Sequence, residues 1–190
     1  SFANNIIALK NQGAKVIVDD VIYFAEPMFQ DGIIARAVDS VVSEGVTYFS
    51  SAGNAGRQSY QSAFRAGDSF PSAAIPSIAG APPFLGGTAH NFDTGAGKDH
   101  FQSVTIPPGT TLIVSLQWDS RYFSVSGAPG TQNNLDLYVL DSSATIVVSG
   151  STLNNIGGDP IELVGTTNNG TSALNVNFMI VNRSGSHPGL

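Results

Sequence analysis

Residues 43–56 read Ser-Glu-Gly-Val-Thr-Tyr-Phe-Ser-Ser-Ala-Gly-Asn-Ala-Gly, and they decide the fold of the amino-terminal part. They predict a helix end at Glu44-Gly45, a buried strand over 46–51, and a turn in which glycines flank Asn54. In open α/β sheets, ligands bind at the carboxyl edge of the strands. An asparagine displayed at that edge can donate its side-chain N–H to a developing oxyanion.

The sequence before this stretch predicts a strand–helix–strand unit. Residues 2–12 carry apolar side chains at helical spacing before Gly13, and residues 15–18 form the apolar run of a buried strand. A second helix, with Asp31 as its expected N-cap, has one apolar stripe over 33–42. Strand, helix and strand with short turns indicate a right-handed crossover in a parallel sheet.

The pattern changes near residue 70. Four prolines with Ala, Gly and Ser over 71–87 are typical of a linker. Beyond it, alternating apolar segments separated by Gly, Pro and Asn turns predict strands over 101–106, 111–118, 135–141, 145–151, 160–167 and 174–183. We therefore expect a parallel α/β segment over 1–70, a linker over 71–87, and an all-β antiparallel sandwich or jelly roll over 88–190.

Composition excludes several classes of protein. The net charge of −6, with only eight Lys and Arg, argues against a nucleic-acid partner. No apolar run is long enough to span a membrane. The absence of cysteine excludes disulfides, zinc thiolates and a cysteine nucleophile. The low charged content, 12%, suits an extracellular bacterial protein, and the start at Ser1 without Met suggests an excised piece of a longer chain.

The α/β segment is expected to be incomplete. Two strands and two helices cannot bury both faces of a parallel sheet. Residues 1–70 should therefore be part of a larger fold, and on their own they should be partly disordered or self-associate through the unfinished sheet.

The segment Gly45-Val46 to Ser51-Ala52-Gly53-Asn54-x-Gly56 closely resembles the oxyanion-asparagine segment of subtilisin-like serine proteases. The helix and strand around Gly13-Ala14-Lys15-Val16-Ile17 extend that resemblance upstream. Residues 88–183, through 135–139 and 159–162, resemble the pre-peptidase C-terminal-like β-sandwich modules of secreted bacterial peptidases.

The resemblance implies a site and a substrate. Asn54 would stabilise the oxyanion, with Gly53 at the substrate, and the substrate would be a protein or peptide. The Asp, His and Ser of the triad would lie outside this chain, so the chain alone should hydrolyse nothing. Taken from its turn alone, Asn54 is better explained as an asparagine that satisfies a left-handed conformation, and the surrounding segment reverses that preference.

Asp19 and Asp20 depart from the family pattern, in which a small polar residue and then Gly follow the strand. Two acids at the end of a buried strand are costly unless they have partners. Three roles stay open for them: lining a substrate pocket, binding a cation, or pairing by hydrogen bonds near the next helix.

Asp93, His100 and Ser172 stand in the chain order of a subtilisin triad, but their surroundings argue against one. The family's Asp ends a hydrophobic strand and its Ser opens a buried helix, whereas Ser172 leads into an alternating strand. The oxyanion Asn54 also precedes all three. A free-standing enzyme built on these residues is the third hypothesis, tested by Ser172→Ala.

No histidine pair has metal-ligand spacing, so no metal site is assigned. Calcium is the one cation considered, with oxygens from Asp119, Asp136, Asp141 and Asp159, although no compact calcium loop is present. The rival function is a non-catalytic binding or adhesion module on a degenerate protease scaffold. Its candidate contact residues are the aromatic Tyr60, Tyr122 and Phe123.

Overall fold

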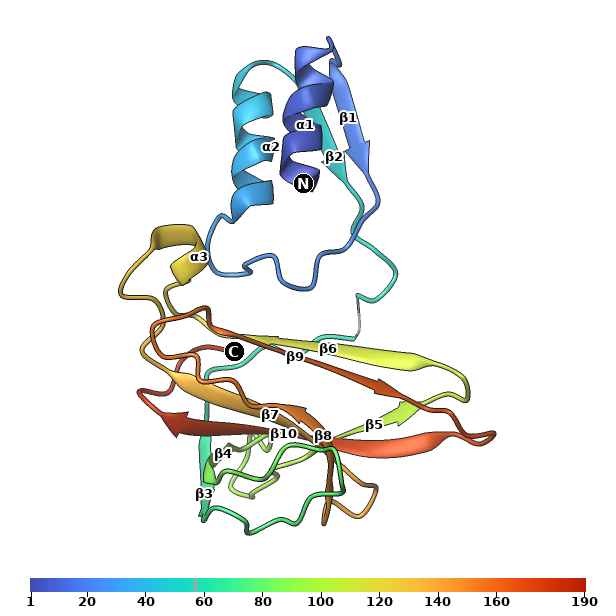
Figure 1. Cartoon of the computed structure of the whole chain (residues 1–190), viewed down its shortest axis with the longest axis vertical. Helices are drawn as coiled ribbons and strands as arrows, with labels where there is room; N and C mark the ends of the chain where they lie inside the picture. Colours follow the sequence, from blue (N-terminus) through green and yellow to red (C-terminus); the bar gives the residue numbers. More distant parts are fainter. Residues whose placement is uncertain (57) are drawn as a thin grey trace. The chain divides into compact units, whose positions relative to one another are not determined.

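The computed structural model describes residues 1–56 and 58–190, and its fold is largely β, with several antiparallel sheets. It divides into two compact units, Ser1–Tyr60 and Gln61–Leu190. The first unit holds α1 (Phe2–Asn11), β1 (Val16–Asp19), α2 (Ile33–Ser43) and β2 (Thr47–Ser50). The two units are coloured blue to cyan and cyan to red in Figure 1.

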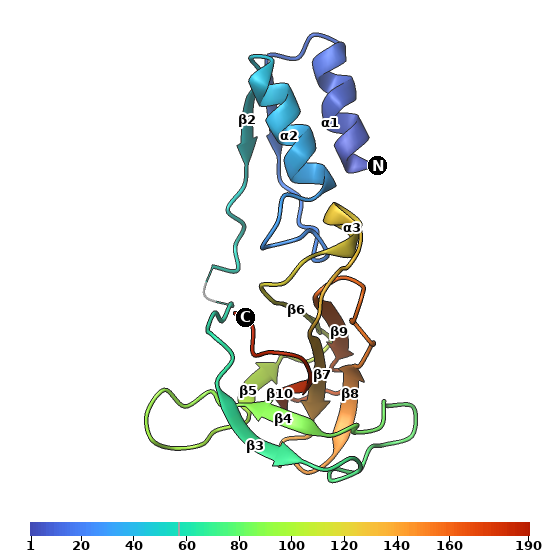
Figure 2. The same cartoon turned by 90° about the vertical axis from the view of Figure 1, so that its left-hand side faces the viewer.

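In the first unit, β1 and β2 pair in parallel, with Val16 opposite Thr47 and Asp19 opposite Ser50. Both helices lie on the same side of this pair (Figures 1 and 2). The core between helices and strands is small and consists of Ala3, Ile6, Ile17, Ala37, Val41 and Val46. The parallel pair and both helices were therefore predicted from the sequence.

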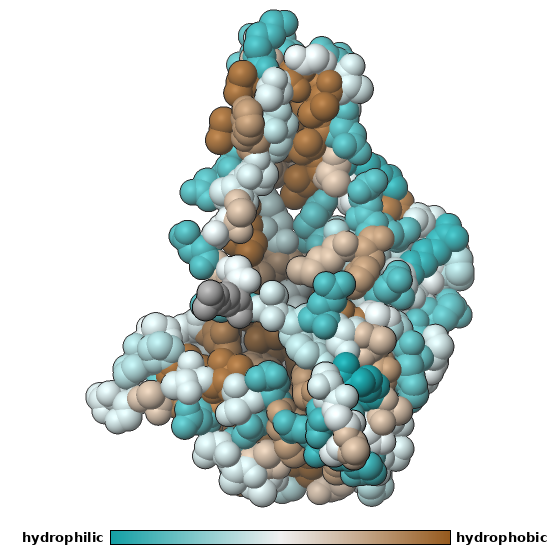
Figure 3. Space-filling model, turned by 180° about the vertical axis from the view of Figure 1, so that it is seen from behind, coloured by the Kyte–Doolittle hydropathy of each residue, from teal (hydrophilic) through white to brown (hydrophobic). Residues whose placement is uncertain are grey.

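The opposite face of the parallel pair is uncovered within this unit. Val16, Val18 and Phe49 alternate with the core residues along the strands and are 57%, 71% and 57% exposed. Figure 3, which views the molecule from behind, shows apolar side chains exposed on this unit. A parallel sheet normally has both faces covered, whereas these side chains on one face of the β1–β2 pair are exposed.

The start of α2 differs from expectation. Its N-cap is Gly32, which has no side chain to cap the helix, so the prediction that Asp31 caps α2 was wrong. The first N–H groups of the helix are instead satisfied by Glu26, a residue of the preceding loop.

The second unit contains eight strands and a short helix. Its elements are β3 (Ala66–Phe70), β4 (Gly87–His90), β5 (Gln102–Ile106), β6 (Thr111–Gln117), α3 (Phe123–Ser126), β7 (Asn134–Leu140), β8 (Val147–Ser151), β9 (Ile161–Thr167) and β10 (Leu174–Ser184). One sheet runs β3-β4-β10-β7-β8, with β5 also pairing with β10, and the other is β6-β9. All of these pairings are antiparallel.

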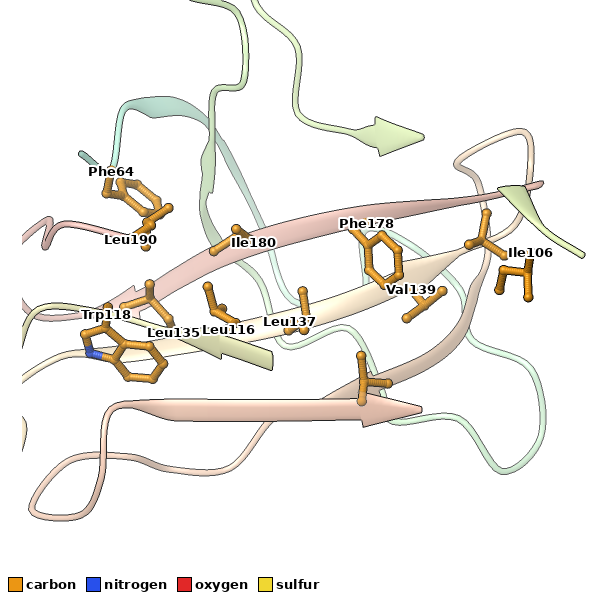
Figure 4. Close-up of a cluster of buried hydrophobic side chains, with 12 residues drawn as sticks. Phe64, Ile106, Leu116, Trp118, Leu135, Leu137, Val139, Phe178, Ile180 and Leu190 are labelled. Atoms are coloured by element: carbon orange, nitrogen blue, oxygen red, sulfur yellow. The ribbon is translucent and has the colours of Figure 1, made fainter. Parts of the chain in front are cut away.

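The main core of this unit lies between the two sheets. Alternate residues of β7 and β10 face Leu116 and Trp118 from the β6 side (Figure 4). Val164 of β9 belongs to the same cluster. A second cluster, around Tyr138, Met179 and Phe84, covers the other face of the larger sheet. All six strands expected from the sequence beyond residue 100 are present, within two residues at each end.

The domain boundary differs from the expected one. Residues 61–70 belong to the second unit, because β3 pairs with β4 in its larger sheet. Residues 71–86 connect these two strands, and they bury Ile75 and Phe84 against the sheet. The proline-rich stretch therefore lies inside the second unit, where it covers one face of a sheet.

The two ends of the second unit pair with each other. Ser62 and Leu190 exchange backbone hydrogen bonds of 3.2 and 2.6 Å, and the Phe64 N–H donates to the Pro188 carbonyl at 2.8 Å. Ala63 and Gly189 form an antiparallel bridge. The chain therefore begins and ends this unit at the same place.

Candidate functional site

The carboxyl ends of β1 and β2 meet at one edge of the first unit and bring the predicted acids beside two serines. The Ser50 hydroxyl donates to Asp19 Oδ1 at 2.8 Å, and the Ser51 hydroxyl donates to Asp20 Oδ1 at 2.6 Å. The Ser51 N–H continues the ladder to the Asp19 carbonyl at 3.1 Å. The two carboxylates thus tie the end of one strand to the end of the other.

Asp19 has a second partner in Tyr48, whose hydroxyl donates to Asp19 Oδ2. Burial, together with this hydrogen bond to a carboxylate, raises the pKa of Tyr48 well above its usual value. Both Asp19 oxygens therefore accept hydrogen bonds from hydroxyl groups. In the part of the chain that the structure describes, the hydrogen-bond partners of Asp19 and Asp20 all lie in β2 or directly after it, and none lies in the helix region near Asp31.

Asn54 lies in the turn that follows β2, and its side chain is exposed. Gly53 before it has a φ of 69°, a left-handed conformation that suits glycine. No residue that the structure describes makes a hydrogen bond to the Asn54 side chain, so its amide can serve a ligand. Asp19, Asp20, Gly53 and Asn54 all lie at or just beyond this strand edge.

This edge can donate hydrogen bonds to an oxyanion, but it has no histidine base of its own. All three histidines of the chain lie in the second unit. His90 is buried, and its Nδ1 accepts the Arg65 N–H at 3.1 Å. His100 Nε2 accepts the Asp68 N–H at 3.1 Å, and His187 stacks on Phe64 with ring centroids 4.8 Å apart.

Asp93, His100 and Ser172 have separate local partners. Asp93 Oδ1 accepts the Gly95 N–H within a turn, and the Ser172 carbonyl accepts the Asn168 amide in another. The His100 nitrogen that would act as a base already accepts the Asp68 N–H. Within the described residues no hydrogen bond joins any two of the three.

Two of the aspartates considered for calcium accept hydrogen bonds from backbone N–H groups of the second unit. Asp141 Oδ1 accepts the N–H groups of Thr145 and Ile146 at 2.7 and 2.9 Å, and its hydrogen bonds, that from Ser143 foremost, lower its pKa to about 2. Asp159 accepts the Ser124 N–H at 2.8 Å. Among residues 1–56 and 58–190, no group of three or more acidic, histidine or cysteine residues could hold a metal.

The burial of two ionisable groups of the second unit was not anticipated from the sequence. Glu162 is 1% exposed, and burial raises its pKa to about 7. Asp136 is fully buried, and burial likewise raises its pKa, against the opposing effects of Tyr138 and Arg183. Each alternates with apolar neighbours along its strand, and nothing in that pattern marks it as buried.

The aromatic residues of the rival hypothesis differ in exposure. Tyr122 is 1% exposed, and its hydroxyl donates to Gln117 Oε1 inside the second unit. Phe123 and Tyr60 are 52% and 43% exposed. Two of the three are therefore exposed.

Comparisons of the chain with protein-family models, curated proteins and solved structures find no match. In the part of the chain that the structure describes, no helix combines the length and apolar character needed to cross a membrane.

Proposed function

We propose that this chain is part of a secreted serine endopeptidase of the subtilisin type, to which it contributes the oxyanion asparagine and an inserted β-sandwich. The observation that carries the proposal is Asn54. Its side chain is exposed, has no partner among the described residues, and follows a parallel strand at the sheet's carboxyl edge.

Two further features support the proposal. The uncovered face with Val16, Val18 and Phe49 is what part of a larger parallel sheet would present. The meeting of Ser62 with Leu190 suits a module placed between two segments of a host domain, because both junctions fall at one point.

The mechanism proposed is acyl transfer by a serine and a histidine located elsewhere in the parent protein. The Asn54 amide would donate to the oxygen of the tetrahedral intermediate, where negative charge develops. Asp19 and Asp20 would hold the strand ends beside the substrate and so keep the turn that carries Asn54 in place.

Labelling of the full-length parent with a fluorophosphonate, followed by mass spectrometry of the adduct, tests this function. We expect an adduct on a serine outside residues 1–190 and none on this chain by itself. An absence of adduct from the parent would contradict the proposal, and an adduct on Ser172 would favour the free-standing enzyme.

Replacement of Asn54 by Ala in the labelled parent tests the role of the side chain. We expect kcat to fall by about 10²–10³-fold with little change in KM, a loss established for such a donor in subtilisin itself. Asn91→Ala, which replaces an asparagine outside the first unit, serves as the control variant. An unchanged kcat in Asn54→Ala would remove the oxyanion role.

The second candidate function is a non-catalytic binding module, which the exposed Phe123 and Tyr60 favour. Glycan-array binding by residues 61–190, lost in Phe123→Ala, would support it. Failure of the parent to react with the fluorophosphonate, combined with such binding, would replace the protease proposal.

A further inference from the structure

The loop between β1 and α2, residues 20–32, begins at the same strand edge as the candidate site. Its residues Val21 and Ile22 are 51% and 69% exposed, whereas the Tyr23 ring lies 5.2 Å, centroid to centroid, from the Phe2 ring of α1. A connection of this length depends on such contacts and on hydrogen bonds for a fixed course.

Glu26, near the middle of the loop, ties it to the start of α2. Its Oε1 accepts the N–H groups of Ile34 and Ala35, both at 3.2 Å. The first N–H groups of a helix lack partners within the helix, and a carboxylate there also interacts favourably with the helix dipole. The Glu26 N–H donates to the Tyr23 carbonyl at 3.1 Å, which folds the loop back on itself.

Gly32 shows how closely the loop approaches the helix. Its φ of −72° is open to any residue, so backbone conformation does not require glycine there. A Cβ at this position would lie 2.5 Å from Glu26 Oε1 and 2.7 Å from Pro27 Cδ. The glycine is therefore explained by the contact of Glu26 with the helix end.

The loop is connected to the candidate site through hydrogen bonds. Asp20, its first residue, accepts the Ser51 hydroxyl, and Ser51 also donates its N–H to the Asp19 carbonyl. Asn54 follows Ser51 by three residues. A displacement of the loop would therefore be transmitted to the turn that carries Asn54.

We propose that Glu26 is a positioning residue: by binding the amino terminus of α2 it fixes the course of residues 20–32, and through Asp20 and Ser51 it fixes the Asn54 turn. The importance of this for catalysis rests on the proposed function. The positioning itself is a property of the 190-residue chain and can be measured without any activity.

The test is amide NMR of the full 190-residue chain. Glu26→Ala removes the acceptor, so we expect shifts at Asp20, Ser51 and Asn54 as well as at the helix end. Hydrogen exchange of the loop amides should become faster by at least about tenfold. Glu26→Gln retains an acceptor oxygen and should restore most of both signals.

Two further variants complete the test. Gly32→Ala pushes on the same contact from the helix side, so it should reproduce the Glu26→Ala pattern, and it decides the outcome if Glu26→Ala does not fold. Asp39→Asn removes an exposed carboxylate from the same helix and should affect only its neighbours. Shifts confined to Ile34 and Ala35 in the Glu26 and Gly32 variants would overturn the proposal.

Failure of this inference and failure of the proposed function give different results. A parent protein that does not react with the fluorophosphonate leaves the NMR result untouched. If the parent reacts with the fluorophosphonate but Glu26→Ala leaves the Asn54 NMR signals of the chain unchanged, the protease proposal stands and the positioning role of Glu26 is wrong.

Discussion

Two buried ionisable side chains of the second unit, Glu162 and His90, should make its stability depend on pH. Glu162 has one carboxylate oxygen bonded to Ser151, and its other oxygen has no hydrogen-bond partner among the residues that the structure describes. His90 lies against Phe64 and Phe92 with no exposed surface. Burial disfavours the charged form of both groups, so the two have opposite effects on stability as pH changes.

Glu162 should destabilise the fold as pH rises. Burial raises its pKa from 4.5 to about 7, so the folded state holds its proton more tightly than the unfolded chain. The free energy of unfolding should therefore fall across this window, by up to about 3 kcal/mol above pH 7. Glu162→Gln, neutral throughout, should be more stable than the native chain at pH 8 and similar to it near pH 4. Urea unfolding at both pH values measures this, and an equal difference at both would contradict it.

His90 should destabilise the fold as pH falls. Burial, and secondarily the nearby Arg65, lowers its pKa from 6.5 to about 4, so only the unfolded chain gains a proton between these values. The contribution of His90 to the free energy of unfolding should fall by about 3 kcal/mol as the pH decreases from 6.5 to about 4. In the native chain the raised pKa values of Glu162 and Asp136 oppose it, so the fall in stability below pH 6.5 should be larger in Glu162→Gln than in the native chain. In NMR the His90 ring protons should titrate near pH 4. A titration midpoint above pH 6 would contradict the lowered pKa of His90.

At the scale of elements, β3 depends on one close contact. A Cβ on Gly67 would lie 2.6 Å from two atoms of the His100 ring, and that ring is held by its bond to the Asp68 N–H. The ring therefore cannot move aside without losing this hydrogen bond. The glycine keeps β3 and the 91–101 connection in contact.

Gly67→Ala should destabilise the second unit by about 1–3 kcal/mol, because it overpacks this contact. Gly165→Ala in β9 is the matched control, since a Cβ there meets nothing within 4 Å and should leave stability unchanged or slightly raised. Thermal unfolding of both variants provides the measurement. Equal thermal unfolding midpoints in the two variants would show that the His100 ring moves aside without loss of stability.

Some strands of the second unit could be predicted from the sequence, and others could not. Strands such as β7 and β10 alternate apolar residues between clear turns, so local pattern is enough to place them. β3 and β4 contain Gly-Asp-Ser and Gly-Thr-Ala with little alternation, and only their pairing in the larger sheet makes them strands. The cap of α2 was missed for a related reason: Glu26 lies eight residues before Ile34, beyond any local capping pattern.

Much of the candidate site was predictable because it depends on chain direction. Parallel strands place their carboxyl ends together, so Asp19, Asp20 and Asn54 could be expected at one edge. The hydroxyl partners of the acids could not be expected, because the alignment of Ser50 with Asp19 depends on strand register.

At the scale of the whole molecule, the two units have separate cores. The second unit contains two apolar clusters of its own, whereas the first has one small cluster and an uncovered sheet face. The self-association expected from the unfinished sheet stays a prediction for this face.

Residues 61–190 expressed alone should therefore fold and keep the unfolding midpoint that they have in the full chain. The full chain should show a second, weaker transition for residues 1–60, which bury less apolar surface. Differential scanning calorimetry of both proteins checks this. A single transition in the full chain that shifts when residues 1–60 are removed would indicate one cooperative unit.

The pairing of Ser62 with Leu190 has a consequence for chain entropy. When two points of a chain are joined by a flexible loop, the cost of bringing them together rises with loop length. Here the folded unit already holds its own ends within hydrogen-bonding distance. A chain that carries this unit between two of its segments therefore bears the closure cost of a short turn, although 130 residues, from Gln61 to Leu190, lie between them.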